Sequence, residues 1–282
     1  MRVRPLKNYP ISLTNRGQLS LFTLGCGSAF ARTLGQNNFI IIKGQTHLML
    51  DCGTKAPSRL RSIGLEVTDV RNFLITHSHA DHIGGLEEVM LTGRYVAGKK
   101  PVVYIDPKYR RILWNDSLKG GAATNERHRG KYLRFEDFWQ VVYPSAENGL
   151  PRDAKSFDIG ELNVKVFRTN HFPEQAQRWE TAAYSVGVLI DDRILFSGDT
   201  KFDASLVADF DEYYDIEWIF HDTQFGTGGV HASLEELASL PESVRSRMLL
   251  MHYPDGWQDH LEKVRSLGFH DFAREWSFYD FD

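Results

Sequence analysis

Cysteine is scarce in this sequence, and long apolar runs are missing from it. Only Cys26 and Cys52 occur among 282 residues, which excludes a disulfide framework and favours a reducing compartment. The best apolar runs, Phe39–Ile42 and Met248–Met251, are as long as strands, whereas a membrane helix needs about eighteen or more residues. The basic start of the chain soon meets polar residues, so we expect no secretory signal. These absences predict a soluble, cytoplasmic protein with no membrane partner.

The composition is that of an ordinary globular protein. Hydrophobic residues make up 42% of the chain and charged residues 25%, which argues against disordered, collagen-like and coiled-coil structures. We expect one domain over residues 1–282. Between about residues 106 and 151 the regular spacing of strands stops, so we interpret that stretch as an insertion or lid and not as a separate domain.

Short runs rich in Val, Ile and Phe recur between turn signals and predict strands. Helices are expected in longer segments that begin with a capping residue or end at a glycine. Strands in two groups with interspersed helices favour sheets packed face to face, with helices outside. The predicted strands are Leu19–Leu24, Phe39–Ile42, His47–Leu50, Phe73–Thr76, Val102–Ile105, Val164–Arg168, Tyr184–Ile190, Arg193–Phe196, Trp218–Phe220 and Met248–Met251, and the predicted helices are Pro57–Ile63, Leu86–Leu91, Ser233–Leu240 and Trp257–Leu267.

Charge is unevenly distributed along the chain. The net charge is -4, but the segment from Arg94 to Arg134 carries +8 and the rest of the chain -12. The overall charge argues against a general polyanion-binding protein. The basic segment is either a solvated loop region or a collar for a phosphate-bearing ligand.

The segment Thr76–His82, with the sequence THSHADH, is the strongest chemical signal. It follows a predicted strand directly, and an extended chain there would place His77, His79 and Asp81 on one side. His82 can turn in behind them as a helix begins. Neutral imidazoles and carboxylates suit zinc, iron and manganese, so four candidate ligands within six residues predict a metal site.

Further candidate ligands follow other predicted strands. His171, Asp199 and His252 each come just after an apolar run, where loops meet at one edge of a sheet. Each residue alone is a weak signal, because a single histidine or aspartate after a strand is often a surface residue or a cap. Their shared position predicts that they join the ligands of the Thr76–His82 segment.

These motifs, together with Leu24–Phe30 (LGCGSAF) and Leu50–Gly53 (LDCG), resemble the metallo-β-lactamase superfamily, and within it the branch of ribonuclease Z and cyclic-nucleotide phosphodiesterases. The resemblance covers about residues 19–253 and implies an α+β fold, the four-layer αβ/βα sandwich. It also implies a homodimer and two divalent ions, with zinc favoured and manganese or iron as alternatives. His77, His79 and His171 would hold one ion, Asp81, His82 and His252 the other, and Asp199 would bridge both. Asp51 would support the site by hydrogen bonds or act as a plain strand-end cap.

The sequence departs from relatives in this superfamily at two places. Cys26 and Cys52 lie upstream of the histidine cluster, where they are small buried residues and not metal ligands, which disfavours antibiotic hydrolysis. The segments Phe220–Phe225 and Val230–Ser233 match the ribonuclease Z pattern only in part, which weakens a role in tRNA processing. We expect His231 to be the general acid, oriented by Asp222, or else a solvent-facing residue, and His221 to bond locally.

Three functions remain open. The first is a phosphodiesterase that acts on a small nucleotide, such as a cyclic nucleotide, or on an RNA 3′ end, because two divalent ions about 3.5–4 Å apart can activate a hydroxide. The second is a hydrolase of carboxylic esters, lactones or thioesters with the same metal site, which the basic segment disfavours. The third is metal-dependent binding or scaffolding without catalysis, which would leave the whole ligand set idle.

Overall fold

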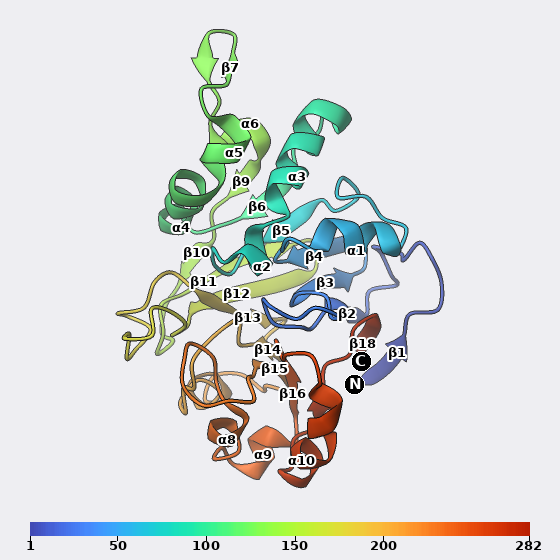
Figure 1. Cartoon of the computed structure of the whole chain (residues 1–282), viewed down its shortest axis with the longest axis vertical. Helices are drawn as coiled ribbons and strands as arrows, with labels where there is room; N and C mark the ends of the chain where they lie inside the picture. The colour runs from blue at the N-terminus through green and yellow to red at the C-terminus, as the bar shows by residue number, and fades with distance from the viewer. The chain divides into compact units, whose positions relative to one another are not determined.

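The computed structural model describes residues 1–282, which form two compact units. Unit 1 comprises residues 1–24, 38–144 and 276–282, and unit 2 comprises residues 25–37 and 145–275. Each unit contains one eight-stranded sheet (Figure 1). None of the helices combines the length and the apolar character that a membrane-spanning helix requires. The single domain expected from the sequence stays a prediction.

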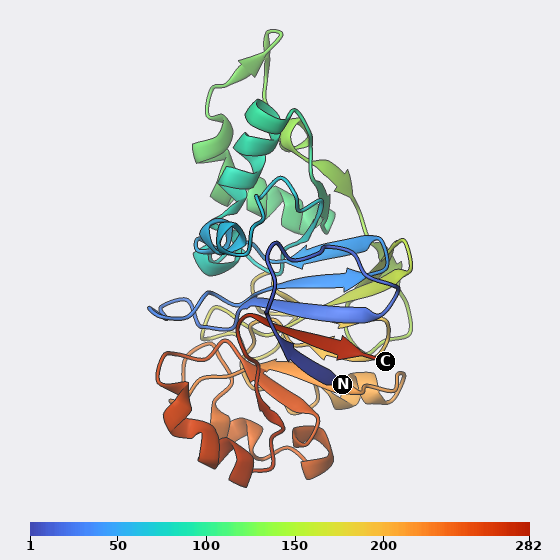
Figure 2. The same cartoon turned by 90° about the vertical axis from the view of Figure 1, so that its right-hand side faces the viewer.

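The sheet of unit 1 is antiparallel at one end and parallel at the other. Pairing of the first strand with the last brings the two chain termini side by side (Figure 2). From the fifth strand in spatial order onward, neighbouring strands run parallel. In spatial order the strands are β1 (Arg2–Pro5), β18 (Ser277–Phe281), β2 (Leu19–Gly25), β3 (Asn38–Lys43), β4 (Thr46–Leu50), β5 (Asn72–Leu74), β6 (Val102–Tyr104) and β9 (Gln140–Val142).

The helices of unit 1 are short, and most of them connect or follow the parallel strands. Asp106 begins one of them, because its side chain accepts hydrogen bonds from the backbone N–H groups of Lys108 and Tyr109. The helices are α1 (Ala56–Ser62), α2 (Ala80–Ile83), α3 (Leu86–Thr92), α4 (Pro107–Ile112), α5 (Lys119–Ala123) and α6 (Phe135–Phe138), with π-helical turns over Gly93–Ala97 and Leu113–Leu118. The stretch 106–151 therefore contains helices and a small hairpin, β7 (Arg127–His128) with β8 (Lys131–Tyr132).

The sheet of unit 2 repeats this plan, with antiparallel strands followed by parallel ones. Ser233 caps α8. Its hydroxyl accepts a hydrogen bond from the Glu236 backbone N–H, and the Glu236 carboxylate accepts one from the Ser233 backbone N–H. The strands in spatial order are β10 (Ser145–Glu147), β11 (Ala154–Ile159), β12 (Leu162–Arg168), β13 (Val186–Ile190), β14 (Ile194–Phe196), β15 (Trp218–Asp222), β16 (Met248–Met251) and β17 (Asp271–Phe272). The helices are α7 (Ala208–Asp211), α8 (Leu234–Leu237), α9 (Glu242–Arg245) and α10 (Leu261–Ser266), the last preceded by a 3₁₀ turn over Trp257–His260.

Strand direction determines where the polar side chains gather within each unit. In unit 2, β14, β15 and β16 are parallel, and β12 runs in the same direction because two antiparallel pairings separate it from β14. The residues that follow these strands therefore lie at one edge of the sheet. In unit 1, β4 and β5 are parallel, so their carboxyl ends share an edge in the same way.

Several expected element boundaries differ from the observed ones, and two of the differences have a clear physical cause. The strand expected to reach Thr76 ends at Leu74, because the chain leaves the sheet towards the histidine-rich loop. The helix expected to reach Leu240 ends at Leu237, and a new short helix begins after Pro241, a residue that breaks the first one.

Candidate metal centre

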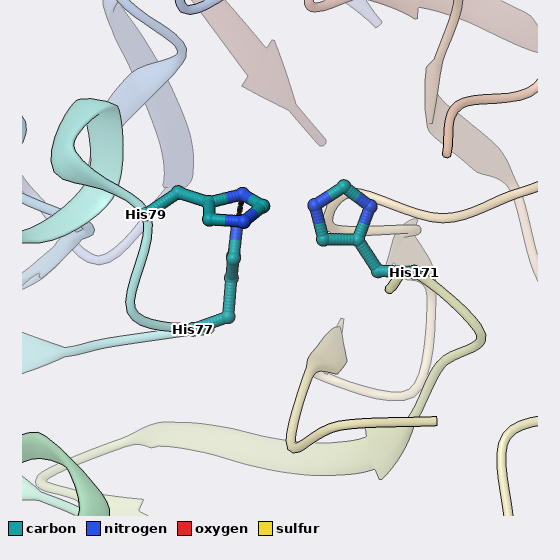
Figure 3. A group of neighbouring side chains, drawn as sticks. All are labelled: His77, His79 and His171. Atoms are coloured by element: carbon teal, nitrogen blue, oxygen red, sulfur yellow. Dashed lines mark hydrogen bonds between the residues drawn. The ribbon is translucent and has the colours of Figure 1, made fainter. Parts of the chain in front are cut away.

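The loop after β5 provides the first candidate ligands of unit 1. His77 is fully buried, and its Nε2 lies 3.0 Å from Nδ1 of His79. Two imidazole nitrogens on one tetrahedral zinc ion, each about 2.0–2.1 Å from the metal, would be roughly 3.3 Å apart, so the observed spacing fits a shared ion. The Thr76 hydroxyl lies 3.0 Å from Nδ1 of His77 and orients that ring. Figure 3 draws both rings, with their hydrogen bond dashed, and the ring of His171.

The second pair of candidate ligands in unit 1 lies on α2. The sequence suggested an extended chain through Asp81, but the helix begins at Ala80, so this part of the expectation was wrong. The helical turn brings Nε2 of His82 to 3.2 Å from the Asp81 carboxylate. At the other edge of the ring, Nδ1 of His82 lies 2.7 Å from Asp51. Asp51 thus fixes the His82 ring so that Nε2 is the nitrogen directed at Asp81.

In unit 2, His171 and Asp199 follow β12 and β14. Nδ1 of His171 donates a hydrogen bond to the Val230 carbonyl at 2.9 Å, which leaves the lone pair on Nε2. Burial lowers the pKa of His171 to about 4, so the ring is neutral and ready to bind a metal. The Asp199 carboxylate lies 4.0 Å from Nε2 of His171 and 3.2 Å from Nε2 of His252. One carboxylate therefore faces two imidazole nitrogens.

Asp222, the last residue of β15, connects two of these histidines. Its Oδ2 atom accepts hydrogen bonds from Nδ1 of His231 at 2.7 Å and from the Thr200 backbone at 2.9 Å. Its Oδ1 atom lies 3.4 Å from Nδ1 of His252. Burial alone would raise the pKa of Asp222, but the charges and hydrogen bonds of His231 and His252 outweigh it and lower the pKa to about 2. Asp222 is therefore an ionised, buried carboxylate that orients both rings.

The remaining two histidines of unit 2 differ in their surroundings. The His231 side chain is 20% exposed, and its ring centroid lies 4.5 Å from that of His252 and 5.0 Å from that of His171. His221 is buried, and its Nδ1 donates to the Asp222 carbonyl at 2.7 Å. Burial lowers the pKa of His221 as well. His231 is thus accessible beside the candidate ligands, whereas His221 bonds locally, as expected.

The donor chemistry of both units fits divalent metal ions. In unit 2 the ligand atoms of two overlapping groups lie within 4.8 Å of one another, one group being His171, Asp199 and His231 and the other Asp222, His231 and His252. Imidazoles and carboxylates are the donors that zinc, manganese and iron accept. Buried carboxylates and neutral imidazoles at the ends of strands offer lone pairs that a divalent cation can accept.

The two cysteines take no part in this arrangement. Cys26 and Cys52 are buried and form no disulfide, and burial raises the pKa of the Cys52 thiol. Cys52 is therefore a protonated core residue at neutral pH, which agrees with the sequence prediction.

The basic segment divides into a structural part and an exposed part. Arg110 forms an ion pair with Glu136, and Arg94 donates to the Asp137 carbonyl at 3.1 Å. The β7–β8 hairpin extends outward from unit 1 and is drawn in green in Figure 1. Its basic side chains are all exposed: Arg127, His128, Arg129 and Lys131.

Some supporting contacts had no signal in the sequence. Ser78, between the first two histidines, donates a hydrogen bond to the Tyr109 hydroxyl at 3.2 Å, which ties α4 to the histidine loop. The contact between Asp222 and His252 joins the ends of β15 and β16. Both contacts depend on which strands and helices become neighbours, and local sequence patterns carry no such information.

Sequence comparison identifies relatives along most of the chain. A family model described as "Anti-Pycsar protein Apyc1" matches residues 19–279. A protein of that name from Paenibacillus sp. (strain J14) is 34% identical over 264 residues, which cover 93% of this chain and 98% of the relative. One from Bacillus phage BSP38 is 34% identical over 259 residues, covering 87% and 93% of the two chains.

Solved structures establish the fold. The metallo-β-lactamase fold protein YhfI from Bacillus subtilis superposes with a TM-score of 0.66 at 13% identity, covering 94% of this chain and 100% of that one. The short form of human tRNase Z gives a TM-score of 0.60 at 17% identity, with coverage of 92% and 98%. The expected α+β metallo-β-lactamase fold is therefore confirmed, and tRNase Z is among the structures that share it.

Proposed function

The chain belongs to the anti-Pycsar protein Apyc1 family, and on that premise we propose that it is a phosphodiesterase that hydrolyses a small cyclic nucleotide. Family membership confirms the sequence prediction of a metal-dependent hydrolase. The cyclic substrate, the number of ions and the role of each residue are our proposals, as are zinc as the native metal and a homodimeric, cytoplasmic protein.

We assign the ligands in three groups. His77, His79 and His171 would hold one ion, Asp81, His82 and His252 would hold the second, and Asp199 would serve both. In support, Nε2 of His82 lies 3.2 Å from the Asp81 carboxylate, and Nε2 of His252 lies 3.2 Å from the Asp199 carboxylate. Each carboxylate is therefore adjacent to an imidazole nitrogen that can bind the same ion. When bound, two divalent ions supply an activated water molecule and neutralise charge on the phosphoryl oxygens.

The observation that carries this proposal is the double contact of Asp222. Its two oxygens face Nδ1 of His231 and Nδ1 of His252, so one buried carboxylate orients a candidate ligand and a candidate proton donor together. Metal binding alone does not require an oriented, solvent-accessible histidine beside the ligands. Hydrolysis of an ester does require a proton donor, because the leaving oxygen must be protonated.

His231 is the proposed general acid. Its Nδ1 atom bonds Asp222, so Nε2 is the atom that can carry a proton to the leaving oxygen. The Asp222 carboxylate stabilises the charged imidazolium before the transfer. Asp51 and Thr76 keep the rings of His82 and His77 in place during the cycle.

A phosphodiester suits this arrangement better than a carboxylic ester. The ribose alkoxide released when a cyclic phosphodiester opens is a poor leaving group, so an oriented acid such as His231 accelerates that reaction strongly. The exposed cations of the β7–β8 hairpin would attract an anionic substrate, whereas a neutral ester would not respond to them. Hydrolysis of esters, lactones or thioesters remains the competing reading.

Product analysis tests the proposal. We expect metal-loaded protein to convert a 3′,5′-cyclic nucleotide to a nucleoside monophosphate, and to release p-nitrophenol from bis-p-nitrophenyl phosphate. A chelator should abolish both reactions. Hydrolysis of p-nitrophenyl acetate or a lactone with no turnover of either phosphodiester would contradict the proposal and favour the competing reading. An RNA with a 3′ extension serves as a third substrate, and cleavage of that RNA alone would move the proposal to RNA ends.

A further inference from the structure

An exposed aromatic side chain stands on a tightly held loop in unit 2. Phe30 is 93% exposed, the highest value among the large hydrophobic residues that are exposed in this chain. It lies in the segment 25–37, which Figure 2 shows in blue as an extended projection of the chain. The next residue, Ala31, is buried. The backbone therefore directs Phe30 outward and Ala31 inward.

Both ends of this loop are bonded to the segment that carries His252. The Ser28 N–H donates to the Tyr253 carbonyl at 3.0 Å, and the Asn37 amide donates to the Met251 sulfur at 3.5 Å. Tyr253 and Met251 are the two chain neighbours of the candidate ligand His252. Any ligand held beside His252 therefore lies near the base of the loop that presents Phe30.

A carboxylate three residues beyond His252 holds the far side of the loop. Asp255 accepts hydrogen bonds from the backbone N–H groups of Arg32 at 2.6 Å and Thr33 at 3.1 Å, and from the Thr33 hydroxyl. The Gly35 N–H bonds the Glu275 carboxylate. These contacts fix the backbone on the side of the loop that follows Phe30.

The glycines at the start of the loop permit this close packing. A Cβ atom on Gly25 would lie 2.3 Å from the Gln36 carbonyl oxygen, and one on Gly27 would lie 2.6 Å from Cβ of Leu34. Neither position accepts a larger residue without moving the opposite side of the loop. The two sides are thus drawn together, and the loop presents Phe30 from a narrow, fixed base.

We propose that Phe30 is a substrate-binding residue that stacks on the nucleobase of the substrate, an inference that rests on the proposed function. An aromatic side chain held on a fixed backbone loses little conformational freedom when it binds a flat ring. Stacking accepts every base, because each base has a π-face. A protein interface usually buries a cluster of large anchors, whereas the residues before Phe30 on this loop are Gly27, Ser28 and Ala29, so a single planar ligand fits better.

The test compares a substrate that has a base with one that lacks it. We expect Phe30→Ala to raise KM for a 3′,5′-cyclic nucleotide by about 5- to 100-fold, from the usual strength of base–aromatic stacking, with kcat within about twofold. KM for methyl riboside 3′,5′-cyclic phosphate, which has no base, should stay unchanged. Phe30→Trp keeps an aromatic ring at this position, so its KM for the nucleotide should stay close to the wild-type value.

Two controls separate this role from others. Tyr213→Ala removes another exposed aromatic side chain of unit 2, outside the loop, and should change neither KM. An unchanged melting temperature shows that Phe30→Ala folds normally. An equal change for both substrates, an unchanged KM, or a change in oligomeric state in place of KM would overturn the inference. If the wild-type protein hydrolyses no cyclic nucleotide, the proposed function fails as well, whereas active wild type with unaltered Phe30→Ala kinetics refutes only the stacking role.

Discussion

The Asp51 carboxylate and the His82 imidazole form a buried pair, with Oδ2 of Asp51 2.7 Å from Nδ1 of His82. Asp51 also accepts hydrogen bonds from the Thr76 backbone and hydroxyl, both at 2.8 Å. Burial raises the pKa of Asp51, and the bonds to His82 and Thr76 oppose that rise. The residue that follows β4 thus orients a candidate ligand on α2.

Removing this carboxylate should weaken metal binding. In Asp51→Asn the ring of His82 loses its charged partner, and we expect metal affinity to fall by about 10- to 100-fold, as is typical when such a supporting residue is changed. Competition with a chromogenic chelator measures the affinity. Asp116→Asn, a change at an exposed carboxylate of the same unit, should have no effect. Equal affinities of Asp51→Asn and wild type would make Asp51 a plain strand-end cap.

His231→Ala should slow turnover without loss of metal. We expect kcat for a cyclic nucleotide to fall by about 10²- to 10⁴-fold, because the leaving alkoxide then departs without a proton. Bis-p-nitrophenyl phosphate should be affected much less, because p-nitrophenolate leaves readily. His270→Ala, a change at an exposed histidine of the same unit, is the matched control. If both substrates slow equally, or if metal content falls with activity, His231 is not the acid.

The Arg4–Asp280 ion pair between β1 and β18 should make stability depend on pH. Burial tends to raise the pKa of Asp280, but hydrogen bonds from Arg4 and Ser20 outweigh burial and lower it. A carboxylate with a lowered pKa stabilises the fold above its unfolded pKa of about 3.9, and this contribution is lost as the pH falls through the folded value. Because the Arg4 side chain is 43% exposed, we expect Asp280→Asn to cost only about 1 kcal/mol at pH 7.

Urea unfolding at several pH values checks this expectation. The difference in free energy of unfolding between wild type and Asp280→Asn should be constant near neutral pH and shrink below about pH 4. A difference that grows as the pH falls would show that the carboxylate is not the group responsible.

The exposed cations of the β7–β8 hairpin should affect substrate capture and not folding. Changing Arg127, Arg129 and Lys131 to Gln should raise KM for a nucleotide by a few-fold and make it less dependent on salt, because screening acts on the charges removed. KM for a neutral ester should not respond. Steady-state kinetics at low and high salt measure both effects. Small, equal changes for both substrates would make the hairpin a solvated loop.

Local patterns in the sequence predicted the centres of both sheets and the candidate ligands, because apolar runs followed by polar donors are readable without the fold. They did not predict β1 or β18, whose pairing joins residues from opposite ends of the chain. Only one of the two histidine contacts of Asp222 was predicted from the sequence. Its contact with His231 was expected, but its contact with His252 depends on the parallel pairing of β15 with β16.

The central claim is that the proposed ligands hold two divalent ions that share Asp199. Elemental analysis of metal-loaded, desalted protein tests it most directly. We predict two ions per chain for the wild-type protein, and loss of both from Asp199→Ala, because a bridging carboxylate serves two coordination spheres. One ion or fewer in the wild-type protein, or two ions retained by Asp199→Ala, would contradict the claim.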